Sequence, residues 1–176
     1  MKRALIATVD AAKARIYLYN EQANPGFELT EIADLDNPGR RLADHEYFSE
    51  ARPGLKGDSG MRRATIGGSR NDQGAPGSAF DNHRDAHRDE MDSRFASRIC
   101  DELDSQVTRR RLPHLVVCAS PRMMGTLRAA SDALHRDGLV YEEIDKDLSN
   151  ISVAHLHDYL ANAGILPARQ RRVAAR

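Results

Sequence analysis

The sequence predicts one α/β domain in which helices cover a mixed sheet. Three observations predict it: strand-like segments follow one another at the start of the chain, helical and strand patterns alternate in its second half, and one of the later strands is apolar throughout. The 176 residues suffice for a single domain with its own hydrophobic core. We expect this domain to span residues 1–166 and residues 167–176 to form a basic, solvated tail.

The first three strands are expected to form an antiparallel meander over residues 3–35. Residues 3–9 are apolar and partly β-branched, and residues 14–19 alternate between apolar and polar side chains, as in a half-buried strand. Asparagine, proline and glycine in residues 20–26 predict a turn. The apolar residues of 27–35 then predict the third strand.

Glycine and basic residues mark the middle of the chain. Seven of the twelve glycines lie between Pro53 and Ser78, together with four basic side chains against two acidic ones. Such a composition cannot bury enough apolar surface to offset its ordering entropy, so residues 50–80 are predicted to form a flexible loop. A loop of this charge can follow an RNA backbone, and it can equally be a solubilising insert. Its candidate binding residues are Arg62, Arg63, Gly67, Gly68, Ser69 and Arg70.

A long helix is predicted after the loop, because apolar side chains recur every four residues from Met91 to Val107. Its first part, residues 81–90, is polar on all sides and is expected to project into solvent. Pro113 ends the helix. Residues 114–119 then form a continuous apolar strand, which is typical of a parallel sheet.

Two more helices and one more strand complete the predicted fold. A helix begins after Ser120, has Pro121 at its first position and runs to Asp137. A strand over residues 139–144 follows, and Ser152 caps the last helix. The residues of this helix that we expect to face inward are Val153, Leu156, Leu160 and Ala163.

Charge and cysteine content limit the classes of function. The chain has 26 basic and 26 acidic side chains, which excludes a strongly basic nucleic-acid binder on global charge alone. Cys100 and Cys118 lie within apolar patterns, so we expect buried, reduced thiols. The apolar run near the N-terminus stops at Asp10, and no later run approaches the roughly 18–20 residues that span a bilayer. We therefore expect a cytoplasmic protein without membrane insertion.

Four segments of the chain are distinctive as a set. They are VDAAKARIYLY, NPGRRLADHEYFSEARPG, LVVCASPRMMGTLR and EEIDKDLSNISVAHLHDYL. Together, in this order and over about residues 3–160, they resemble the bacterial host-attachment protein family, whose members are described as required for attachment to host cells. Because an adhesin must leave the cell and we find no export signal, the resemblance implies an indirect role in attachment.

That family is in turn similar to the middle domain of archaeal and eukaryotic peptide-release factors, which has a ribonuclease-H-like α/β shape. In that domain a basic, glycine-rich loop precedes a long helix, and a glycine-glycine-glutamine tip triggers peptidyl-tRNA hydrolysis. Gly67 and Gly68 occupy the comparable place, but Ser69 stands where glutamine would be required. The resemblance therefore implies the fold and does not carry over the activity.

Three carboxylates are weak candidates for metal-dependent catalysis. Asp10 follows the first strand, where ribonuclease-H-like nucleases place a metal-binding carboxylate, and Asp145 and Asp147 follow the last strand. Two-metal phosphoryl chemistry needs three or four convergent carboxylates. The structural alternative is that Asp10 binds turn amides while Asp145 and Asp147 organise a loop. We assign no catalytic residue, metal or cofactor from the sequence.

Two histidine pairs and one strand-to-helix junction are further candidates for a site. His83 and His87 are four residues apart on a predicted helix, but they lack the neighbouring glutamate and third ligand of a zinc protease, so a solvated helix face is favoured. His155 and His157 would lie on different faces of a helix. Ser120 and Arg122 are the candidate anion-site residues, at the N-terminus of a predicted helix. They form either a weak phosphate contact or a plain helix cap.

These observations favour a non-catalytic, intracellular interaction module that contacts protein or ribosome/RNA through residues 50–80 and acts indirectly in attachment. The alternative is a hydrolase that acts on nucleic acid or peptidyl-tRNA. Catalysis would require an acidic cluster around Asp10 or a substitute for the missing glutamine, whereas binding requires neither.

Overall fold

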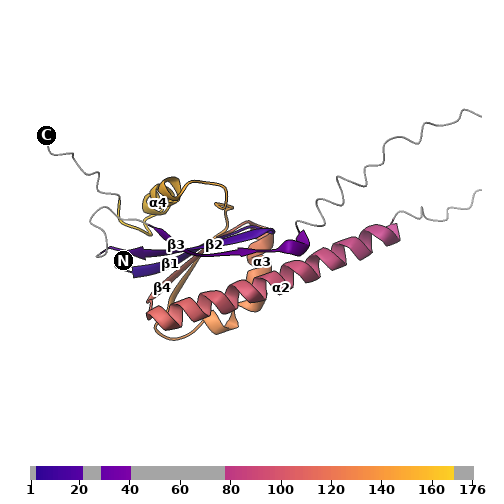
Figure 1. Cartoon of the computed structure of the whole chain (residues 1–176), viewed down its shortest axis with the longest axis horizontal. Helices are drawn as coiled ribbons and strands as arrows, with labels where there is room; N and C mark the ends of the chain where they lie inside the picture. Colours follow the sequence, from indigo (N-terminus) through magenta and orange to yellow (C-terminus); the bar gives the residue numbers. More distant parts are fainter. Residues whose placement is uncertain (1–2, 22–28, 41–77, 169–176) are drawn as a thin grey trace, which may run out of the picture.

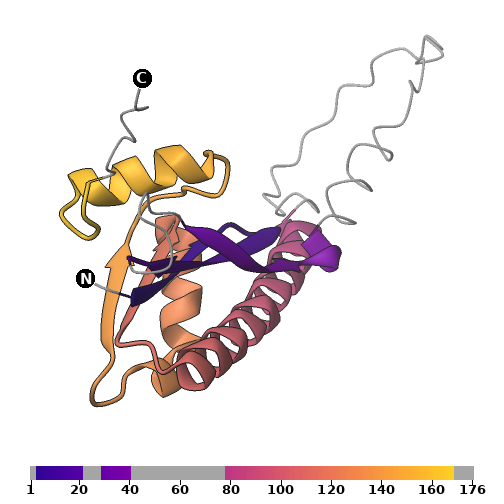
Figure 2. The ribbon, with the colours of Figure 1, turned by 60° about the vertical axis from the view of Figure 1, so that its left-hand side comes forward.

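The computed structural model describes residues 3–21, 29–40 and 78–168, and the side chains of its longest helix from Ala86 onward. In this part of the chain, five strands form one mixed sheet in the order β3-β2-β1-β4-β5. Helices lie on both faces of the sheet (Figures 1 and 2). The predicted α/β fold with a single mixed sheet is therefore confirmed.

The N-terminal strands form the predicted antiparallel meander. β1 (Arg3–Val9) pairs with β2 (Lys13–Asn20), and β2 pairs with β3 (Thr30–Asp36). β3 begins at Thr30 instead of residue 27, and Phe27 lies outside the described residues. β1 is buried at every position after Arg3, because it has a neighbouring strand on each side.

The second half of the chain adds the parallel strands. β4 (His114–Ala119) pairs with β1, and β5 (Val140–Ile144) pairs with β4. Five of the six residues of β4 are buried, which agrees with its continuous apolar sequence. Because β1, β4 and β5 run in one direction, their carboxyl ends lie at the same edge of the sheet.

The sheet separates two hydrophobic cores. Helices α2 (Ser78–Arg110) and α3 (Pro121–Ala130) cover one face, and α4 (Val153–Asn162) covers the other (Figure 1). Successive side chains of a strand point to opposite faces. Leu5 therefore packs with the core under α2 and α3, whereas Ile6 packs with the core under α4.

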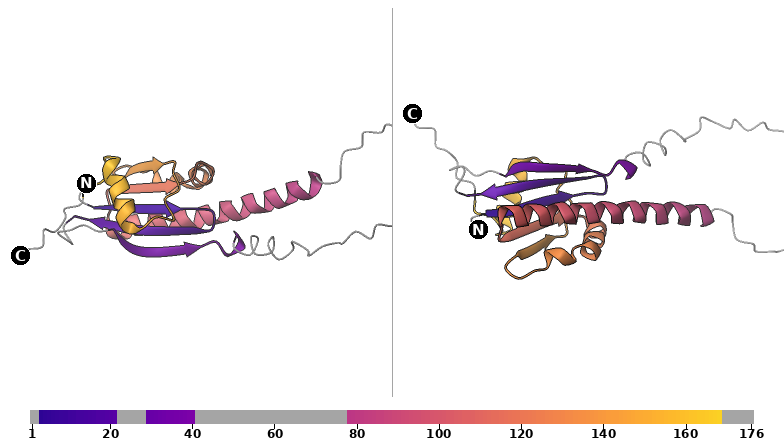
Figure 3. Two further views of the ribbon diagram at one scale, coloured as in Figure 1. Left: turned by 90° about the horizontal axis from the view of Figure 1, so that it is seen from above. Right: turned by 60° about the horizontal axis from the view of Figure 1, so that its bottom comes forward.

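The first part of α2 extends beyond the edge of the sheet (Figures 1 and 3). The side chains of residues 86–90 are mostly exposed, whereas Phe95, Ile99 and Leu103 are buried against the sheet. For the described side chains this confirms the prediction of a polar helical extension followed by an apolar stripe.

Two predicted helix details are wrong. The helix after Ser120 ends at Ala130 and not at Asp137; a 3-10 turn, η1 (Asp132–Leu134), follows it. The buried hydroxyl of Ser131 donates to the carbonyl oxygen of Arg128 (3.1 Å), and such a local bond competes with continuation of the helix.

The expected inward position of Ala163 is also wrong. α4 ends at Asn162, so Ala163 is the C-cap residue and its side chain is exposed. Gly164 follows with φ +78°, a left-handed conformation that terminates helices and favours glycine.

Candidate functional site

The candidate site lies at the carboxyl ends of the parallel strands, where ligands commonly bind in α/β sheets. We call this region the carboxyl edge and define it by residues 10–12, 37–40, 89–92 and 120–122. It brings together the β1–β2 turn, the end of β3, the projecting part of α2 and the start of α3. Figure 3 shows the short helical segment after β3 beside α2.

Asp10 organises the turn between β1 and β2. Its Oδ1 accepts hydrogen bonds from the backbone N–H groups of Ala12 (2.6 Å) and Lys13 (2.8 Å). The backbone N–H of Asp10 in turn donates to the carbonyl oxygen of Lys13 (2.9 Å). Of the two interpretations offered for Asp10, the structural one, in which its side chain binds turn amides, is confirmed.

Asn37, which follows β3, holds the same turn through two hydrogen bonds. Its backbone N–H donates to the carbonyl oxygen of Ala12 (2.7 Å), and its side-chain Nδ2 donates to that of Ala11 (3.0 Å). The side chain is buried. No local pattern in the sequence indicates this role, because the contact joins residues that are 26 positions apart.

The short helical segment at residues 38–40 packs directly on α2. A Cβ atom on Gly39 would lie 2.5 Å from Sδ of Met91, so a side chain at this position would force Met91 to move. Arg40 follows, and its backbone N–H donates to the carbonyl oxygen of Asn37 (3.2 Å). The chain therefore leaves the described fold at Arg40 from a position that is fixed against α2.

Ser120 and Arg122 begin α3 at this edge. Ser120 occupies the N-cap position without a side-chain capping bond, and its carbonyl oxygen accepts the N–H of Met124 (2.8 Å). Nη2 of Arg122 lies 2.7 Å from Oδ1 of Asp89, and both side chains are about two-thirds exposed. The guanidinium of Arg122, a candidate anion-site group, thus pairs with a carboxylate of α2. An exposed ion pair of this kind contributes about 0–1 kcal/mol to the free energy of unfolding.

Asp92 is a buried carboxylate one helical turn beyond Asp89. It is 4% exposed, and its Oδ1 has no hydrogen-bond partner among the described residues. Burial raises the pKa of Asp92, whereas the positive charges of Arg40 and Arg122 act in the opposite direction. In the sequence, Asp92 lies four residues before Ala96 and seven before Ile99, so it falls on the apolar side of the helix. An acidic residue on that side is the feature that could have indicated its burial.

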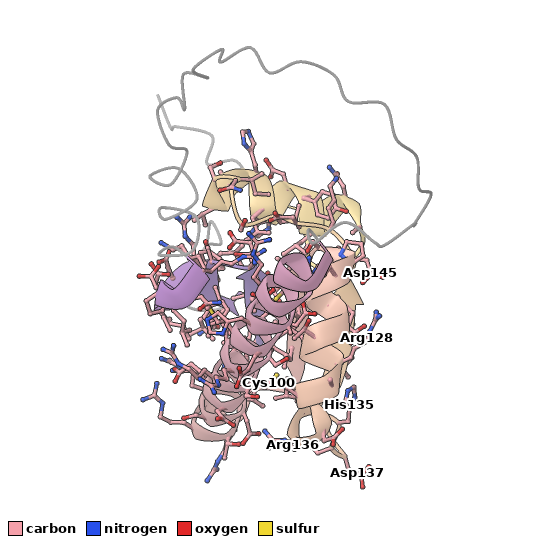
Figure 4. The ribbon with its side chains drawn as sticks, turned by 90° about the vertical axis from the view of Figure 1, so that its right-hand side faces the viewer. Cys100, Arg128, His135, Arg136, Asp137 and Asp145 are labelled. Atoms are coloured by element: carbon pink, nitrogen blue, oxygen red, sulfur yellow. The ribbon has the colours of Figure 1, made fainter. Side chains whose placement is uncertain are left out.

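Asp145 and Asp147 organise the segment after β5. Oδ1 of Asp145 lies 3.4 Å from Nη2 of Arg128, a side chain that also binds Glu143 (Figure 4). Oδ1 of Asp147 accepts bonds from the backbone N–H (2.9 Å) and the hydroxyl (2.6 Å) of Ser149. Across the described residues, no group of three or more His, Cys, Asp or Glu side chains is arranged to hold a metal ion.

The predicted histidine positions are dispersed. The side chain of His83 lies outside the described residues, and those of His87 and His155 are exposed. His157 is 2% exposed, its Nε2 lies 2.9 Å from the carbonyl oxygen of Pro167, and its ring meets Tyr19 edge-on. His157 therefore belongs to the core under α4.

Ser131 and His135 form a pair just after α3, which no motif in the sequence indicates. Oγ of Ser131 lies 3.2 Å from Nε2 of His135 (His135 is labelled in Figure 4). Because the hydroxyl proton is donated to the carbonyl oxygen of Arg128, the serine oxygen is left to accept from the imidazole in the tautomer that carries its proton on Nε2. A serine nucleophile requires the reverse arrangement, so this pair closes the end of α3.

Both cysteines are free and buried, as predicted. Burial raises the pKa of the Cys100 thiol to about 11 and that of Cys118 to about 12. Both thiols therefore stay protonated at neutral pH, which makes them poor nucleophiles.

The loop candidates Arg62, Arg63, Gly67, Gly68, Ser69 and Arg70 lie outside the described residues. The described chain stops at Arg40 and resumes at Ser78, the first residue of α2. The carboxyl edge is therefore the part of the described fold from which this segment departs.

Comparison with known proteins identifies the family. A family model described as "protein required for attachment to host cells" matches residues 5–160. No curated protein matches the chain. Within the described residues, every helix is too short or too polar to cross a membrane. The matched range includes all five strands and the three described α-helices, apart from the first residues of β1 and the last of α4. The chain belongs to the family of proteins required for attachment to host cells.

Proposed function

We propose that this protein is a non-catalytic, intracellular interaction module that acts indirectly in attachment to host cells. Its working surface is the glycine- and arginine-rich segment 50–80, which contacts ribosome/RNA or protein. Arg62, Arg63 and Arg70 supply charge for an RNA backbone, and Gly67 and Gly68 allow that backbone to approach closely.

The observation that supports this proposal most is that residues 37–40, the last described residues before the segment, are held on the carboxyl edge. Asn37 holds the end of β3 to the β1–β2 turn, and Gly39 lies against Met91 of α2. A segment attached to a rigid scaffold loses less conformational entropy when it binds a partner than a segment attached to a mobile scaffold.

The residues that the hydrolase alternative needs are used differently. Asp10 and Asp147 each accept two hydrogen bonds from nearby groups in the chain. Ser69 in place of glutamine argues against a release-factor reaction. The release-factor resemblance stays a prediction about the fold and carries no activity. Two buried, free thiols favour a reducing, intracellular location.

The test is a pull-down from bacterial lysate with the tagged wild-type chain and with a variant that lacks residues 54–77. A matched control lacks residues 169–176, the basic tail. We expect RNA or a protein to be captured by the wild type and the control but lost with the loop deletion, and nuclease treatment separates the two kinds of partner. Unchanged partners after the loop deletion would contradict the proposal. Circular dichroism of both variants checks that the fold is kept.

A further inference from the structure

The opposite end of the molecule holds an open cavity of about 370 Å³. It lies between the last turn of α2 and the segment that leads from η1 into β5. Val107, Leu112 and Leu139 supply apolar side chains to it, and Arg111 and Arg136 supply charge. We call this region, residues 107–113 and 136–140, the amino end, because β4 and β5 begin here.

Arg111 is held at this cavity by an unusual backbone conformation. Its φ is +51°, in the left-handed region that favours glycine, and it is the one non-glycine residue with positive φ in the described chain. Its N–H donates to the carbonyl oxygen of Thr108 (3.2 Å), and that of Leu112 donates to Val107 (3.0 Å). These two bonds form a Schellman helix end, in which glycine usually occupies the position of Arg111.

The cavity lies in a basic environment. Nη2 of Arg109 and Nε of Arg110 both donate to Oε1 of Gln106 (2.8 and 2.9 Å), a neutral acceptor. Arg3 of β1 donates to the carbonyl oxygen of Arg110 (3.0 Å) and so adds a further positive charge.

Three carboxylates lie near these arginines, and the first is Glu102, whose Oε1 accepts from Nε2 of Gln106 (2.6 Å). Asp104 pairs with Arg136 (2.6 Å), and Asp137 lines the cavity; Figure 4 labels Arg136 and Asp137 at this end. Arg111 itself forms no hydrogen bond or ion pair through its side chain with any described residue. The helix dipole accounts for basic residues in the last turn of α2, but it does not require arginine at a glycine position.

Apolar surface continues from the cavity onto the sheet edge. Val140, the first residue of edge strand β5, follows Leu139 and is 47% exposed; it is the one exposed large hydrophobic side chain in the described part. Its N–H donates to the carbonyl oxygen of Pro113 (2.9 Å), which fixes it beside the cavity.

We infer that the amino end is a docking site for an acidic peptide segment of a protein partner, with an apolar side chain in the cavity and a carboxylate on Arg111. The aliphatic floor suits an apolar side chain, and guanidinium–carboxylate pairing supplies charge complementarity. No aromatic ring lines the cavity in the described part, so the stacking platform typical of single-stranded RNA sites is missing. This inference does not depend on the proposed role of residues 50–80.

The experiment is an NMR titration of the ¹⁵N-labelled full chain with three probes: a peptide of Asp and Glu around a central Leu, the same peptide with Asn and Gln in place of the acids, and a short oligoribonucleotide. We expect the acidic peptide to shift amide signals at residues 107–113 and 136–140. The neutral peptide should bind at least about fivefold more weakly, as expected for the loss of a charged contact.

Arg111→Gly is the decisive variant, because glycine fits the left-handed backbone and the fold is retained. We expect it to weaken acidic-peptide binding at least about fivefold. Arg94→Ala, an exposed arginine of α2 that pairs with Glu90, is the matched control and should bind like the wild type. The inference is overturned by an acidic peptide that shifts no signal at the amino end, by equal binding to Arg111→Gly, or by an oligoribonucleotide that binds there with the same dependence on Arg111.

Discussion

The two ends of the sheet use their charged side chains differently. At the carboxyl edge, Asp10 accepts two backbone N–H groups and Arg122 pairs with Asp89. At the amino end, Arg109 and Arg110 share the neutral side chain of Gln106. The polar groups of the carboxyl edge thus hold neighbouring elements together. At the amino end Arg136 does the same by pairing with Asp104 of α2, whereas Arg111 forms no side-chain hydrogen bond or ion pair with a described residue. The described chain stops at Arg40, at the carboxyl edge.

The largest loss of stability is expected from a substitution in the part of α2 that lies between the carboxyl edge and the amino end. Phe95→Ala removes a side chain that is 2% exposed in the core under α2. We expect the free energy of unfolding to fall by about 3–5 kcal/mol. Urea denaturation measures this, and the neighbouring Arg94→Ala should change it by less than about 0.5 kcal/mol. A small effect of Phe95→Ala would mean that α2 is not packed as described.

Substitution of Asp10 should cause a smaller loss of stability, and it distinguishes a structural role of Asp10 from a role as metal ligand. Asp10→Ala removes both hydrogen bonds to the turn, which should cost about 2 kcal/mol. Asp10→Asn keeps an acceptor oxygen and should recover most of that loss in thermal or urea denaturation. If instead Asn behaved like Ala and added Mg²⁺ stabilised the wild type alone, Asp10 would be a metal ligand.

At the amino end a substitution should stabilise the fold. Arg111→Gly relieves a left-handed backbone that disfavours residues with a Cβ atom, so we expect a gain of about 0.5–1 kcal/mol in chemical denaturation. At the carboxyl edge Gly39→Ala should have the opposite sign, because its Cβ would meet Met91. Destabilisation by Arg111→Gly would show that the arginine supports the helix end.

The smallest effect concerns Asp92 and depends on pH. Burial raises the pKa of Asp92, so the folded chain keeps this proton to higher pH than the unfolded chain does. Stability therefore falls as pH rises from the ordinary carboxyl pKa to the raised one, and the loss is complete above it. Asp92→Asn cannot ionise.

The expected signature is a gain of Asp92→Asn over the wild type that grows from about pH 4 to pH 7. Thermal unfolding at several pH values measures it. Asp89→Asn serves as the control: it should lose a little stability at pH 7, because it removes the exposed pair with Arg122. A pH-independent difference for Asp92→Asn would show that its carboxyl group ionises as freely as in the unfolded chain.

Local patterns in the sequence predicted most of the fold. The alternation in residues 14–19 and the apolar run in 114–119 are both typical of strands, and these two strands were predicted to within about one residue at each end. The end of α3 was missed because it depends on the hydroxyl of Ser131, which bonds back to Arg128. Helix periodicity alone cannot register such a competing bond.

The site was less predictable, because its contacts join distant segments. Asp10 was singled out, but only geometry could separate a turn-binding carboxylate from a metal ligand. Asn37 and Gly39 matter through contacts with Ala11 and Met91, and no local pattern reveals those partners. Arg111 has an ordinary place in a basic run of the sequence, and only its backbone conformation distinguishes it.

The most direct test of the central claim is the salt dependence of RNA binding. Filter binding of ribosomal RNA compares the wild type, the triple variant Arg62→Glu, Arg63→Glu, Arg70→Glu, and a control with the same charge change in the tail, Arg169→Glu, Arg171→Glu, Arg172→Glu. If the loop arginines contact phosphates, the slope of log affinity against log salt should become shallower by about 2–3 in the loop variant and stay unchanged in the tail variant. Equal slopes in all three proteins would contradict contact between RNA phosphates and the arginines of residues 50–80.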